Sequence, residues 1–232
     1  MTHFLKQIIA TAALAFSAAT HAASPAKDLE VQGTLRTPRC LVSADKDGIY
    51  DYGAMSLSSL PASGHVPLPP SKQVWTVTCS GAPTYVTYRI NDAREGTASG
   101  AGTGSERVFG LGRMAERDAS RIGFYEIWAS NAKVAGATRL HGAYSPSRQN
   151  IYGAATNVVR PRTGNGYDEV VMTWSSQSGW APLSAMQAGN QFSIDLEVRP
   201  FLASQSVVGA GGPVTEMVHL DGLATITFAF GL

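Results

Sequence analysis

An alternation of apolar and polar residues precedes the first cysteine of the chain. In the stretch Asp28–Cys40 the apolar face carries Leu29, Val31 and Leu35, and Gly33 stands between them on the same face. Period-two alternation predicts a strand with one buried face, and a glycine on such a face often marks the close approach of another chain segment. The pattern fits an ordinary first strand of an antiparallel sheet, and it also fits an apolar strand held outside the domain.

Similar short runs recur along the chain, and no helical period competes with them. Short strands with turn signals about every ten residues predict an all-β protein, a β-sandwich. Residues 73–79 and 84–90, joined by a Gly-Ala-Pro turn, predict a hairpin, and the Gly/Ala/Ser-rich residues 91–106 predict a surface loop. Further strands are expected at residues 108–112, 121–130, 169–174, 191–201 and 223–232.

The last of these runs alternates strictly. Ile226, Phe228 and Phe230 share one face, with threonines and an alanine on the other. We expect the three apolar side chains to face the core and one edge of the strand to stay unpaired, which makes it a template for another strand. An internal strand with both edges paired would bury the same residues, so the pattern leaves both interpretations open.

The N-terminal residues predict export. Residues 1–22 combine a lysine, an apolar run too short to span a bilayer and small residues ahead of a cleavage point, as in a secretory signal peptide. The expected organisation is a signal peptide at 1–22, an extension at 23–36 and one domain at 37–232. In an exported chain the two cysteines, Cys40 and Cys79, are expected to form a disulfide.

Charge and motifs exclude several function classes. Removing Lys6 with the signal leaves 17 basic against 17 acidic residues, which argues against nucleic acid or an anionic membrane as a partner. No nucleophile elbow, phosphate-binding loop or zinc motif is present, so we expect no catalytic site, metal or cofactor. Core packing is the default for the four tryptophans, and a sugar-binding platform is the alternative.

The order of these features resembles a chaperone–usher fimbrial subunit: a signal peptide, an alternating extension, a cysteine seven residues after its glycine, a second cysteine and an alternating C-terminal strand. In detail the chain resembles the fimbrial-like proteins of the domain-of-unknown-function family 1120. The matching stretches are Asp51-Tyr52-Gly53, Leu68-Pro69, Val77-Thr78-Cys79, Asn91-Asp92-Ala93-Arg94, Phe109-Gly110-Leu111-Gly112 and Ile122-Gly123-Phe124-Tyr125.

The resemblance implies an immunoglobulin-like, pilin-type sandwich that lacks its final strand. A periplasmic chaperone would supply that strand first, and the extension of a neighbouring subunit would replace it during assembly at the outer-membrane usher. Leu29, Val31 and Leu35 would then fill the groove left by the missing strand, and Gly33 would lie where that groove is too shallow for a side chain. Ile226, Phe228 and Phe230 would belong to the strand against which the donated strand docks. Two other functions stay open: a glycan-binding tip adhesin, and a self-sufficient secreted sandwich whose first strand closes its own sheet.

Overall fold

The computed structural model describes residues 38–99, 107–114, 120–145, 149–161, 170–210 and 217–231. The chain divides into the units Met1–Leu35 and Arg36–Leu232, and every described residue belongs to the second. The expected signal peptide and the alternating extension with Leu29, Val31, Gly33 and Leu35 therefore lie outside the described residues. No helix in the described ranges is long and apolar enough to cross a membrane.

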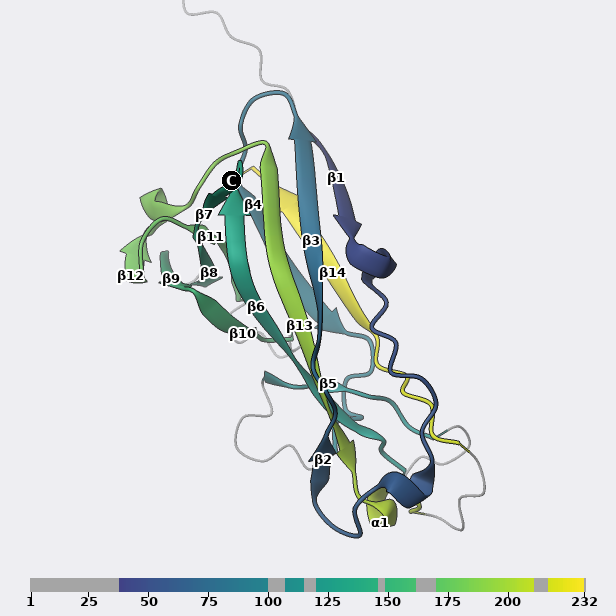
Figure 1. Ribbon diagram of the computed structural model, residues 1–232. Coiled ribbons are helices and arrows are strands. Elements are labelled where there is room, and N and C mark those ends of the chain that lie inside the picture. Colours follow the sequence, from purple (N-terminus) through teal and green to yellow (C-terminus); the bar gives the residue numbers. More distant parts are fainter. Residues whose placement is uncertain are drawn as a thin grey trace, which may run out of the picture. The chain divides into compact units, whose positions relative to one another are not determined.

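Two antiparallel sheets form a sandwich, as the alternation predicted (Figure 1). The first sheet has the order β1-β3-β13-β6-β10, and three short strands attach to β13 and β6. Its members are β1 (Arg39–Ala44), β3 (Ser71–Ser80), β13 (Gln191–Ala203), β6 (Gly123–Val134) and β10 (Thr156–Val159), with β2 (His65–Pro67), β5 (Phe109–Gly110) and β7 (Ala137–Thr138).

The second sheet has the order β12-β9-β8-β11-β4-β14. Its members are β12 (Gly179–Pro182), β9 (Asn150–Ala154), β8 (Leu140–Ser145), β11 (Val171–Ser175), β4 (Val86–Asp92) and β14 (Ala224–Phe230). Among the described residues, single-turn helices connect strands at η1 (Asp45–Gly48), η2 (Leu57–Ser59), η4 (Leu183–Ala185) and α1 (Gln205–Val208).

The main core lies between the sheets and is built by alternate side chains of the long strands. Phe192, Ile194 and Leu196 of β13 are 1–2% exposed. Trp174 of β11 packs edge-on against Phe192 at 5.2 Å, and its indole N–H donates to the Ser193 carbonyl at 3.1 Å. The indole therefore buries a large apolar area and still satisfies its one donor.

The expected hairpin of residues 73–79 and 84–90 is wrong. β3 pairs with β1 and β13, whereas β4 pairs with β11 and β14 in the other sheet. The link between them crosses the end of the sandwich, where Thr84 exchanges backbone hydrogen bonds with Gly189. Periodicity reports which face of a strand is buried and not which strand lies beside it, so both strands were found and their pairing was not.

The expected surface loop at residues 91–106 is right only in part: residues 93–99 do form a loop, but it starts later and is less exposed than its composition indicates. β4 continues to Asp92, and Thr97 and Ser99 are buried. The composition of this segment is typical of a loop because its polar side chains bond to backbone groups, which is what turn-forming residues do. These bonds form part of the candidate site.

Candidate functional site

β14 is an edge strand whose inward face is incompletely covered. Among the described residues it pairs only with β4. The three β4 residues opposite its apolar side chains are each 1% exposed, yet the β14 side chains themselves are only half-buried. The register pairs are Ile226 with Ile90, Phe228 with Tyr88 and Phe230 with Val86.

β1 shows the same loss of cover at the edge of the other sheet. In the described chain it pairs only with β3, where Cys40 lies directly opposite Cys79 and the two form the predicted disulfide. Val42 and Val77 are also paired and share the inward face. Val77 on β3 is 2% exposed, whereas Val42 on the neighbouring edge strand β1 is 42% exposed.

The two incomplete edges lie on the same side of the sandwich (Figure 1). Trp174 and Phe192 stack β11 over β13, and the Asn157 side chain of β10 donates to the His141 carbonyl of β8 at 2.8 Å. With β10 over β8 and β13 over β11, β1 and β14 end the two sheets on the same side of the sandwich. We call the inward-facing side chains Val42, Ile226, Phe228 and Phe230 the open seam.

One end of the open seam is closed by backbone pairing. The chain that follows β1 meets the chain that leads into β14 at Met55 and Val218, and the Val218 N–H donates to the Met55 carbonyl at 3.0 Å. From this bridge the two edges continue toward Arg39 and Phe230, and over the described residues no strand pairing joins them.

Two tyrosines hold the chain after β1 against the first sheet. The Tyr50 hydroxyl donates to the Leu196 carbonyl at 2.9 Å and accepts from the Trp75 indole N–H at 3.2 Å. The Tyr52 hydroxyl donates to the Val198 carbonyl at 3.0 Å. Burial raises the pKa of both phenols to about 12, so both hydroxyls stay neutral at physiological pH.

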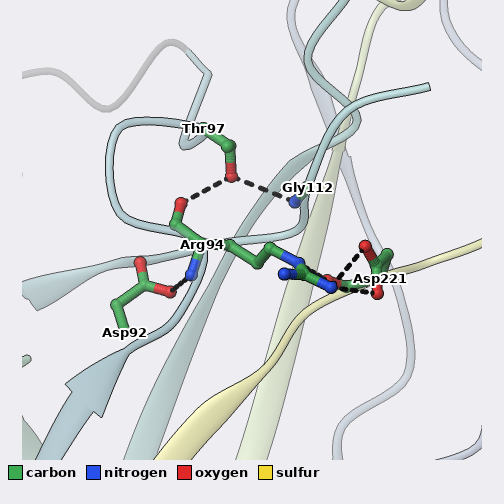
Figure 2. A network of polar contacts seen from close by, with 5 residues as sticks. All are labelled: Asp92, Arg94, Thr97, Gly112 and Asp221. Carbon is green, nitrogen blue, oxygen red and sulfur yellow. Dashed lines mark hydrogen bonds and ion pairs between the residues drawn. The ribbon is translucent and has the colours of Figure 1, made fainter. Parts of the chain in front are cut away.

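A polar network fixes the base of β14, and we call it the β14 latch (Figure 2). The Arg94 guanidinium contacts both carboxylate oxygens of Asp221, at 2.8 and 2.7 Å, and donates to the Asp221 carbonyl at 3.0 Å. Thr97 donates its hydroxyl proton to the Arg94 carbonyl and accepts from the Gly112 N–H, at 2.8 and 3.0 Å. Asp92 accepts from the Arg94 N–H at 2.8 Å. The latch therefore ties the end of β4 to the segment entering β14.

The glycines of the Phe109–Gly112 stretch are required by this packing. A Cβ on Gly110 would overlap the Thr97 hydroxyl and the Arg94 carbonyl, and Gly112 has a φ of 86°, a conformation that favours glycine. The second carboxylate oxygen of Asp92 accepts from the Gly110 N–H at 2.8 Å. Burial raises the pKa of that carboxyl above its usual range despite these hydrogen bonds.

In the described ranges no group of three or more His, Cys, Asp or Glu side chains is placed to hold a metal ion. Comparison with known proteins adds no family: no protein-family model and no curated protein matches this chain.

Proposed function

We propose that this protein is a structural subunit of a cell-surface fimbria, exported to the periplasm and assembled by donor-strand exchange. The observation that carries the proposal is the open seam: two edges of one sandwich, each with one side unpaired within the described chain. On their inward faces Ile226, Phe228 and Phe230 are half-buried and Val42 is 42% exposed. A sandwich with this defect gains stability when a further strand lies between β1 and β14, because the strand buries apolar surface and occupies edge hydrogen-bonding groups.

The alternating extension has the pattern that such a strand needs. In β-augmentation the main chain supplies affinity and alternate side chains fill pockets. Leu29, Val31 and Leu35 recur at the same period of two as Ile226, Phe228 and Phe230. Gly33 would lie where the donated strand passes closest to the core.

The partners in this proposal follow from the order of assembly. A periplasmic chaperone would cover the open seam first, and the outer-membrane usher would then exchange it for the extension of a neighbouring subunit. The latch supports this function because it holds the β14 edge in place by bonds that a donated strand does not have to replace. The disulfide supports it by fixing β1, the other edge, to β3.

Deleting Ala23–Leu35 tests the proposal. The full mature chain and the truncated chain are each expressed with the candidate chaperone and purified from the periplasm through a tag on the chaperone. Both are expected to be captured and folded, and only the full chain should polymerise when mixed with usher. A truncated chain that is unfolded even with chaperone present would show that the extension is a strand of the sandwich in the same chain, and the proposal would fail.

A further inference from the structure

The four tryptophans have different environments, and only one of them is strongly exposed. Trp174 is 1% exposed in the core, and Trp75 is half-buried and bonded to Tyr50. Trp128 is half-buried beneath the Arg199 guanidinium, 4.3 Å from the ring centroid. Trp180 in β12 is 63% exposed. The packing that explains the other three indoles does not explain this one.

Trp180 forms an exposed aromatic pair with Tyr152. The two residues are direct cross-strand partners in β12 and β9, with ring centroids 5.3 Å apart at 65°. Tyr152 is 41% exposed. Met172 of β11 lies opposite Ala143 of β8, which in turn lies opposite Tyr152. The pair therefore continues the row of side chains that faces the core, but at this edge of the sheet both rings remain exposed to solvent.

The strands beneath the pair are anchored on their other face. Ile151 and Ala181, the neighbours of Tyr152 and Trp180, are 0% and 4% exposed and belong to a separate small core with Ala185 and Met186. The two rings therefore stand on a packed two-stranded base, so a ligand would not have to order the backbone that presents them.

The strands that carry and adjoin the pair have no charged side chain, which favours a neutral ligand. Residues 149–159 and 170–194, which include β9, β10, β11 and β12, contain no Asp, Glu, Lys or Arg. An anionic ligand such as nucleic acid or an acidic lipid would find no countercharge on these strands. Asn150, which is exposed and two residues from Tyr152 on the same face, offers an amide, and the Tyr152 hydroxyl can donate or accept.

The edge itself is poorly suited to adding another strand. β12 has four residues, begins at Gly179 and ends at Pro182, and short edges with proline are a recognised protection against strand pairing. A second copy of the chain would thus find few backbone groups to bond. The rings, rather than the backbone, are the feature available for recognition.

We propose that Trp180 and Tyr152 form a binding platform for a neutral saccharide. The apolar C–H face of a pyranose would pack on the indole, which contributes a large apolar surface at low cost in side-chain entropy. Its hydroxyl groups would remain hydrated or bond to Tyr152 and Asn150. Because β12 and β14 are opposite edges of the same sheet, the platform and the open seam can be occupied together, and this inference does not depend on the proposed fimbrial assembly.

The test is a screen of the purified mature protein against an array of neutral oligosaccharides, with their sialylated and sulfated counterparts beside them. Hits are then titrated by calorimetry against wild type and the variants Trp180→Ala, Trp180→Phe and Tyr152→Ala. Ile49→Ala is the matched control, because Ile49 is 64% exposed and lies outside the platform. Circular dichroism confirms that each variant is folded.

We expect neutral glycans to bind, Trp180→Ala to weaken binding about tenfold or more, Tyr152→Ala to weaken it less, and Trp180→Phe to retain part of it. Ile49→Ala should bind as wild type does. The proposal is overturned if no neutral saccharide binds at millimolar concentration, if binding requires the charged groups, or if Trp180→Ala binds normally. It is equally overturned if Trp180→Ala instead abolishes self-association, because the pair would then be a contact between copies.

Discussion

Replacing both Cys40 and Cys79 by alanine should destabilise the domain substantially. The cysteines are separated by 39 positions, and the chain-entropy relation for a loop of that size gives about 4 kcal/mol at 25 °C. For a domain of this size each kcal/mol shifts the melting temperature by about 2–4 °C, so the expected fall is roughly 8–16 °C.

The effect should concentrate at the open seam. Within the described chain β1 is held by β3 alone, and Val42 on its inward face lacks the cover that Val77 has. Loss of the disulfide should therefore free β1 before the rest of the sheet. In hydrogen exchange, the amides of β1 should lose protection while those of β13 keep it until global unfolding.

The assay is urea and thermal unfolding of the mature protein in its soluble form, with Ser80→Ala as the control. Ser80 is exposed, adjoins Cys79 and contributes one hydrogen bond, to the Arg39 carbonyl at 3.3 Å. Adding reductant to wild type should reproduce the stability of the double variant. A loss below about 1 kcal/mol, or no effect of reductant, would show that closing this loop does not stabilise the fold.

Three further outcomes are expected. Phe228→Asp should abolish capture by the chaperone in a pull-down because a carboxylate would be desolvated in the seam, whereas Thr227→Lys, on the exposed face, should be captured normally; equal capture of both would contradict a docking edge. Gly110→Ala should lower the melting temperature because its Cβ would overlap a backbone carbonyl, and an unchanged melting curve would show that the loop adapts. Burial lowers the pKa of His141 to about 3, and its ring lies 2.8 Å from the Tyr88 hydroxyl. In the unfolded chain the imidazole takes up a proton near pH 6.5, whereas in the folded chain it stays neutral until about pH 3. The free energy of unfolding should therefore fall as the pH drops from about 6.5 toward 3. Replacement of His141 by Gln should flatten that slope in denaturant titrations, and an unaltered slope would assign it elsewhere.

The features predictable from sequence were the local ones. Alternation placed Ile226, Phe228 and Phe230 on one inward face because side chains of a strand alternate whatever its neighbours are. An even number of cysteines, together with the expectation of export, predicted the Cys40–Cys79 disulfide. The partner of β4 was not predictable in this way, because it depends on where the chain crosses between sheets.

The β14 latch had no local signal. Arg94 and Asp221 are 127 positions apart, and each lies in a segment whose composition is that of a loop. The exposed aromatic pair was similarly hidden: Trp180 resembles the other tryptophans in sequence context, and only the end of the sheet at β12 leaves it uncovered. Edges and long-range pairs are properties of the assembled sheets, which periodicity does not report.

The most direct test of strand donation is hydrogen exchange along β14 in the chain lacking residues 23–35, released from its chaperone in the presence or absence of a synthetic peptide of residues 28–36. Without the peptide we expect rapid exchange at β14 and aggregation, and with it a stoichiometric complex whose β14 amides are protected. A peptide with Gly33→Leu should protect poorly, because it overfills a shallow site. A stable folded monomer whose β14 amides are already protected without any peptide would show that β14 needs no donated strand.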